Sequence, residues 1–223
     1  MSQVEEDLAK LLAQMKLVLQ GTQGMLAHPQ SRMFRVHKVL TVHVETESSP
    51  DQVSQLVNSI IQEDLLYSLA RSIHLLPFES RKDTQAIFSH VLRFKPLNST
   101  APDPPALAYI IDTRPEVVVE LCRGYEHRES AMPCGVVLRE ALKHEAIAEI
   151  ILYDQSVKGE KVARINDIDL EEKQTGNGVF WDFFSWIDRG AFEVSTDAFT
   201  TFRVCYAPQV CTMCPLTYES RTS

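Results

Sequence analysis

The chain has 223 residues, of which 44% are hydrophobic and 23% charged, and its formal net charge at pH 7 is −8. This length is enough for one large domain or two small ones with a buried core. The negative charge argues against a nucleic-acid partner, and no apolar run reaches the ~18 residues of a membrane span. Acidic residues at positions 5–7 precede the first apolar stretch, which is unlike a secretory leader. Five cysteines in a chain of this length are not a disulfide framework, so we expect a cytoplasmic protein.

Apolar residues recur at three- and four-residue spacing along most of the chain, which is typical of amphipathic helices. Residues 96–105 hold four prolines and are expected to form a loop. Residues 155–177 are rich in charge and lack periodicity, which indicates an exposed insertion. No hairpin or βαβ alternation is found, so the sequence predicts an all-α fold. The expected helices cover residues 8–19, 50–76, 78–95, 105–112, 115–124, 130–143, 144–154, 179–188 and 195–203.

A weak internal repeat runs through three of these helices. Ala86, Gly135 and Ala198 each precede bulky residues in an amphipathic helix and lie 49 and 63 residues apart. Without the insertion, the second spacing approaches the ~40–47 residues of armadillo and HEAT repeats. Three small residues can also occur in helices by chance. The pattern nevertheless favours an armadillo/HEAT-like helical-repeat solenoid, in which a small residue lets a neighbouring helix come close.

Motifs for catalysis or metal binding are incomplete. His144-Glu145 begins like a zinc-protease helix but lacks the second histidine one turn later. The strongest metal signal is the group Cys205, Cys211 and Cys214, which contains a C-x-x-C pair. A closed zinc site needs a fourth ligand that the neighbouring sequence does not supply, so unliganded thiols are the simpler interpretation.

Two basic residues, Arg139 and Lys143, lie four positions apart and would share one helix face on an otherwise acidic chain. One interpretation is a solvated face balanced by nearby glutamates. The other is a small basic site for an acidic or phosphorylated partner.

Several whole motifs together resemble the mouse protein 25 family, also called calcium-binding protein 39, and in particular its fungal HymA-like branch. The resemblance extends over about residues 4–23 and 45–203. It is carried by residues 83–92, 121–126, 134–140 and 197–202.

This resemblance implies an armadillo-like solenoid that is not an enzyme and carries no cofactor or metal. Members of the family are scaffolds that bind germinal-centre-type serine/threonine kinases and pseudokinases and promote kinase activity. In fungi they act in signalling for morphogenesis, polarity and conidiophore development. We therefore expect a cytoplasmic, monomeric adaptor with a protein kinase or pseudokinase as its partner, and with neither nucleic acid nor membrane.

The predicted partner contacts are Arg139 and Lys143, followed by Arg93 and Arg203 near the ends of helices in the same repeat position. The alternative function is a metal-binding or enzymatic protein that uses the Cys205, Cys211 and Cys214 group.

Two segments depart from the family pattern. Residues 24–44 interrupt an otherwise family-like stretch, and residues 204–223 form a non-homologous tail that we expect to be disordered. The residues at their edges can be encoded by codons that contain splice-site sequences, so we interpret both segments as translated introns, with residues 1–203 as the repeat domain. Such a chain would lack the C-terminal repeats of the family and would leave an apolar face uncovered, which favours aggregation.

Overall fold

The computed structural model describes residues 50–97, 99–157, 160–168, 175–189 and 191–206. The expected helix at residues 8–19, the segment 24–44 and most of the tail lie outside the described residues. The described part of the chain is all helical and contains no strand, which confirms the predicted class. Its α-helices are α3 (Pro50–Gln62), α4 (Leu65–Ser72), α5 (Phe78–Arg93), α6 (Pro105–Asp112), α7 (Glu116–Arg123), α8 (Arg128–Ala141), α9 (Glu145–Tyr153), α10 (Val179–Arg189) and α11 (Phe192–Cys205). Short 3₁₀ turns are η1 (Ile73–Leu75), η2 (Gly124–Glu126) and η3 (Ile165–Asp167).

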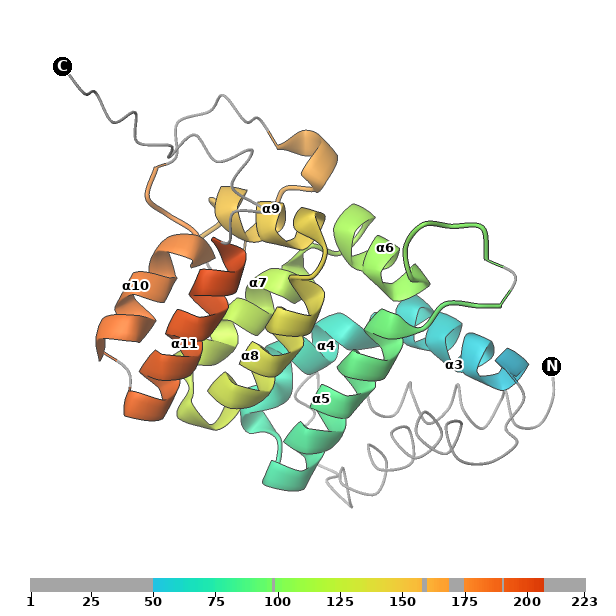
Figure 1. The fold of residues 1–223 in the computed structure, drawn as a ribbon, viewed down its shortest axis with the longest axis horizontal. Coiled ribbons are helices and arrows are strands. Elements are labelled where there is room, and N and C mark those ends of the chain that lie inside the picture. The colour runs from blue at the N-terminus through green and yellow to red at the C-terminus, as the bar shows by residue number, and fades with distance from the viewer. Residues whose placement is uncertain (1–49, 98, 158–159, 169–174, 190, 207–223) are drawn as a thin grey trace.

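The helices stack in a repeating order (Figure 1). Each of α3 to α8 packs against the helix three places later in the chain. The repeating unit is therefore a set of three helices, α3–α5, α6–α8 and α9–α11. The third helices, α5, α8 and α11, lie side by side as one layer. This is the architecture of an armadillo-like repeat protein, as the sequence predicted.

The three small residues of the internal repeat all lie in this layer, Ala86 in α5, Gly135 in α8 and Ala198 in α11. Gly135 shows why a small residue is needed there. A Cβ at this position would overlap the Asp197 carboxylate of α11 and the Tyr125 hydroxyl of η2. The two helices can approach this closely only because position 135 has no side chain.

One expected helix is wrong in its extent. The predicted run over residues 50–76 divides into α3, α4 and η1, with a break at Glu63 and Asp64. Asp64 has a φ of 50°, in the left-handed region that ends a helix and that aspartate tolerates better than most residues. Both helices bury their apolar sides, so hydrophobic spacing does not reveal the break.

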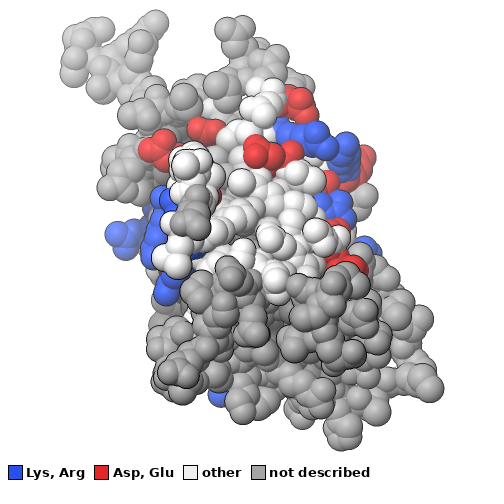
Figure 2. Space-filling view, turned by 90° about the vertical axis from the view of Figure 1, so that its right-hand side faces the viewer, with Lys and Arg blue, Asp and Glu red and all other residues white. Residues whose placement is uncertain are grey.

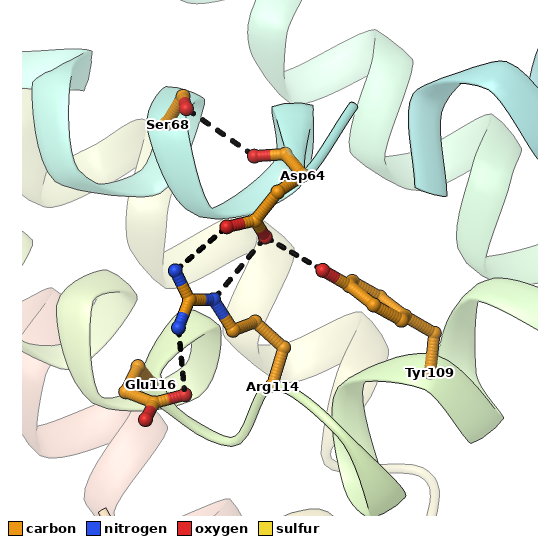
Figure 3. Close-up of polar contacts among 5 residues, drawn as sticks. All are labelled: Asp64, Ser68, Tyr109, Arg114 and Glu116. Carbon is orange, nitrogen blue, oxygen red and sulfur yellow. Dashed lines mark hydrogen bonds and ion pairs between the residues drawn. The ribbon is translucent and has the colours of Figure 1, made fainter. Parts of the chain in front are cut away.

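The side chain of Asp64 ties this break to the second repeat (Figure 3). Its carboxylate accepts a hydrogen bond of 2.6 Å from the Tyr109 hydroxyl and one of 2.6 Å from Arg114 Nη2. Burial is the main cause that raises the pKa of the Tyr109 hydroxyl, and the hydrogen bond to Asp64 raises it further. Tyr109 therefore remains a hydrogen-bond donor, and the α3–α4 corner is fixed against α6 and the turn before α7.

The insertion begins and ends at neighbouring points of the stack. The buried Asp154 carboxylate accepts a hydrogen bond of 3.0 Å from the backbone N–H of Val179, the first residue of α10. Beside this contact, the backbone N–H of Thr175 donates to the side chain of Gln155, the residue after Asp154, at 3.2 Å. Most described residues between these points are exposed, with Val162 buried as an anchor. The third repeat, α9–α11, therefore keeps its three helices despite the inserted residues between α9 and α10.

None of the described helices combines the length and the apolar content that a membrane crossing requires.

Gly135→Ala tests the close approach of α8 and α11. Glycine to alanine normally stabilises a helix interior by about 1 kcal/mol. Here the added methyl meets the Asp197 carboxylate, so we expect the free energy of unfolding to fall by about 1–3 kcal/mol. Urea unfolding followed by circular dichroism measures it.

Met132→Ala, on the exposed side of the same helix, is the matched control and should change stability by less than about 0.5 kcal/mol. A Gly135→Ala variant as stable as the parent would contradict the packing.

Candidate partner-docking site

The layer of third helices carries the four predicted contact residues. Arg93 ends α5, Arg139 lies in the last turn of α8, Lys143 follows α8 and Arg203 lies in the last turn of α11. The structure divides these four residues among three different environments.

Arg93 and Lys143 meet at one carboxylate, Glu140 of α8. Arg93 Nε donates to Glu140 Oε1 at 2.7 Å, and Lys143 Nζ donates to Glu140 Oε2 at 2.8 Å. The arginine and lysine side chains are 65% and 63% exposed, whereas the glutamate is only 15% exposed. The hydrogen bond from Arg93, with further help from Lys143, lowers the pKa of Glu140 to about 2. Glu140 therefore stays ionised and holds two exposed cations at the junction of the first and second repeats.

Two further basic residues extend this pair. Lys95 Nζ donates to the carbonyl oxygen of Pro102, and His144 Nδ1 lies 3.9 Å from Asp103 Oδ1. These contacts connect the end of α5, the proline-rich loop and the turn after α8 into one surface. We call Arg93, Lys95, Lys143 and His144 the basic cluster.

Figure 2 shows the end of the stack at which α3 lies. Lys and Arg side chains lie at the left margin of this view, on the side of α5, and again at the upper right among acidic side chains, with a central surface of few charges between them. A locally positive surface on a chain of net charge −8 is suited to an acidic or phosphorylated partner segment.

Arg139 is turned inward instead, into a buried network between the second and third repeats. Its Nη2 lies 2.9 Å from Asp197 Oδ1, and its Nη1 donates to Thr201 Oγ1 at 2.8 Å. The Tyr125 hydroxyl donates to Asp197 Oδ2 at 2.6 Å and lies 2.8 Å from Thr201 Oγ1. Burial, followed by the hydrogen bond to Asp197, raises the pKa of Tyr125. Arg139 therefore joins α8 to α11 rather than adding to the basic cluster.

Arg203 is exposed at the end of α11 and forms no ion pair with any residue that the structure describes. Its charge is thus available to solvent, apart from the basic cluster.

The cysteine group is only partly described. Cys205 is buried in α11, and Cys211 and Cys214 lie outside the described residues. Burial also raises the pKa of the Cys122 and Cys134 thiols, which makes both poor metal ligands. No three His, Cys, Asp or Glu side chains among the described residues are placed to hold a metal ion.

A pocket of about 220 Å³ lies on another surface, where α4 and α7 end. His74 and His127 line it, and their rings stack on each other with centroids 4.2 Å apart. Its charged lining combines Arg71 and Arg123 with Glu120 and Glu126, so the pocket favours neither anions nor cations.

The amino-acid sequence was compared with the profiles of known protein families. The profile of the Mo25-like family matches residues 1–208. The chain belongs to the Mo25-like family.

Among curated Mo25-like relatives, the conidiophore development protein hymA of Emericella nidulans is 56% identical over 202 residues, which are 91% of this chain and 47% of that protein. The Mo25-like protein of Schizosaccharomyces pombe is 33% identical over 159 residues, 71% of this chain and 40% of the relative. Human calcium-binding protein 39-like is 30% identical over 159 residues, 71% of this chain and 39% of the relative. The chain thus spans half or less of the length of these relatives.

These matches confirm the family predicted from the sequence motifs. Mo25 family proteins are non-catalytic scaffolds, in agreement with the prediction that the chain is not an enzyme.

Sequence reasoning missed Lys95 and His144 as neighbours of Arg93 and Lys143. Lys95 lies only two positions from Arg93, but nothing in the sequence shows that the loop after it folds back onto the turn after α8. Glu140 could have been found, because it lies three positions before Lys143 and so within reach of it at the end of a helix.

The lowered pKa of Glu140 predicts a pH-dependent contribution to stability. A carboxyl whose folded-state pKa is depressed stabilises the fold above its unfolded-state pKa, and this effect disappears as the pH falls towards the folded value. Glu140→Gln should therefore cost about 1 kcal/mol at pH 6, a modest value because both cationic partners are exposed. The difference from the parent should shrink steadily between about pH 5 and pH 2. Urea unfolding across this range measures it.

Glu129→Gln in the first turn of the same helix is the control, because Glu129 is exposed and has no ion-pair partner among the described residues. A Glu140→Gln deficit that stayed constant from pH 6 to pH 3 would contradict the role given to Arg93 and Lys143.

Proposed function

We propose that the protein is a non-catalytic adaptor that binds a serine/threonine kinase of the germinal-centre type, alone or with a pseudokinase, and promotes its activity. The observation that carries this proposal is the continuous layer of α5, α8 and α11, in a chain of a family of scaffolds. A layer of parallel third helices offers an extended surface to a folded partner rather than an enclosed site for a small molecule.

The proposed mechanism is stabilisation of the active kinase conformation. A scaffold shifts a kinase towards its active state only if it binds that state more tightly than the inactive one. A preformed surface meets this requirement, since a layer whose helices are fixed by Asp197, Gly135 and Asp64 can fit one arrangement of the kinase lobes better than another.

The basic cluster is the proposed charged part of this surface. Arg93 and Lys143 each use part of their donor capacity on Glu140 and keep most of their side-chain surface exposed. Their free donors suit carboxylate or phosphate groups on the partner. Arg203 supplies a separate contact at the far end of the layer, and Arg139 contributes by holding α11 in place.

The biological setting that we propose is fungal morphogenesis and polarity, in the cytoplasm. Its support is the 56% identity to a protein named for conidiophore development. An acidic adaptor would act as a monomer on protein partners, without nucleic acid or membrane.

Charge reversal in the basic cluster tests the proposal. A germinal-centre-type kinase from the same organism should bind the purified chain, and its activity on a peptide substrate should rise on binding. The double variant Arg93→Glu and Lys143→Glu should weaken binding roughly tenfold or more, because two exposed attractive charges become repulsive. Isothermal titration calorimetry and a kinase assay give the two measurements.

Arg164→Glu, at another exposed arginine, is the matched control and should bind like the parent. If the double variant bound and activated the kinase as the parent does, the basic cluster would not be the docking site. If no kinase of this class bound the parent, the proposed function would be wrong.

A further inference from the structure

The loop between α5 and α6 carries an exposed threonine next to the basic cluster. Its backbone turns at Pro96, whose carbonyl accepts a hydrogen bond of 3.0 Å from the Ser99 N–H. The Ser99 hydroxyl then accepts one of 3.3 Å from the Ala101 N–H. Thr100 is exposed, and its hydroxyl has no hydrogen-bond partner among the residues that the structure describes. Of the two adjacent hydroxyl groups, that of Ser99 accepts a hydrogen bond and that of Thr100 takes part in none among the described residues.

The loop is fixed against the basic cluster immediately after Thr100. Lys95 donates to the Pro102 carbonyl, and Asp103 lies 3.9 Å from the His144 imidazole. His144 follows Lys143 directly in the chain. Thr100 is thus two residues before Pro102, which Lys95 contacts, and three residues before Asp103, which lies near His144, the neighbour of Lys143.

We propose that Thr100 is a phosphorylation site whose phosphate binds the lysines of the basic cluster. A protein kinase would transfer the γ-phosphoryl group of a nucleoside triphosphate to Thr100 Oγ1. The new bond joins this oxygen to phosphorus as the bond from phosphorus to the β-phosphate oxygen breaks. The hydroxyl proton passes to a base of that kinase, and the nucleoside diphosphate leaves. Asp103 lies three residues after Thr100, where acidophilic serine/threonine kinases recognise a carboxylate.

The charges around the loop favour this arrangement. A phosphate adds about −1.5 to −2 charges and three strong acceptor oxygens. The basic cluster supplies three permanent cations, Arg93, Lys95 and Lys143, against two carboxylates, Asp103 and Glu140. Glu140 is largely buried and already paired with two cations, so it opposes the phosphate less than an exposed carboxylate would. Lys95 and Lys143 keep donors free for the new anion.

The phosphate would occupy the same lysine that is proposed to contact the kinase partner. Phosphorylation would thereby weaken docking, a consequence that rests on the proposed function. The modification and its contacts with Lys95 and Lys143 do not rest on it, and they can be tested without a partner.

The first experiment locates the phosphate. The full chain is incubated with an acidophilic serine/threonine kinase and ATP, and the modified residue is mapped by mass spectrometry. We expect one phosphate on Thr100, lost in Thr100→Ala and retained in Ser99→Ala. Absence of phosphate from Thr100, or its transfer to Ser99 instead, overturns the proposal.

The second experiment tests the contacts by following the ³¹P signal of the phosphorylated chain against pH. Nearby lysines favour the dianion, so the second pKa of the phosphate should be about 0.5 lower in the parent than in the double variant Lys95→Gln and Lys143→Gln. Lys161→Gln, an exposed lysine in the insertion, is the control and should leave this pKa at the parent value. Equal values in the parent and the double variant overturn the lysine contacts.

Discussion

The stack depends on a position in α8 that leaves no room for a side chain. At Gly135 the backbone of α8 comes so close to α11 that the Asp197 carboxylate and the Tyr125 hydroxyl fill the space of a Cβ. A buried carboxylate is costly unless it is paired and hydrogen-bonded. Arg139 and Tyr125 provide that pairing for Asp197, with Thr201 completing the network. The close packing and the polar network therefore require each other, and together they set the position of the third repeat on the second.

The contact between the first and second repeats is made differently. Here Arg93 of α5 reaches Glu140 of α8 at the surface, and the more buried tie is the Asp64 group with Tyr109 and Arg114. Arg93 and Lys143 at this junction stay exposed, whereas Arg139 at the next junction is withdrawn into the fold. This difference explains why Arg93 and Lys143 lie at the surface and Arg139 does not. It also links structure to the proposed docking role, because the same ion pair that joins two repeats presents Arg93 and Lys143 to a partner.

Most helices and their repeat order could be predicted from the sequence, because amphipathic spacing and a recurring small residue are local signals. The break at Asp64 could not, since apolar spacing continues through a corner when both helices face the same core. Arg139 and Lys143 were expected on one helix face. However, α8 ends at Ala141, and the inward turn of Arg139 depends on Asp197, 58 positions later in the chain. Helix spacing shows which residues can be neighbours within a helix, but not which distant carboxylate forms an ion pair with an arginine. The placement of Lys95 and His144 beside the same loop likewise depends on how that loop folds back, which hydrophobic spacing does not show.

The central claim is that α8 holds the layer together, so the backbone hydrogen bonds of α8 should be the last to open. It packs on α5 at one side and α11 at the other, whereas α3 lies in the first of the three described repeats. Hydrogen–deuterium exchange of the intact chain, read by mass spectrometry, measures this most directly. The account predicts that amides of α8 exchange at least as slowly as those of α5 and α11 and more slowly than those of α3. Exchange in α8 as fast as in α3 would contradict it.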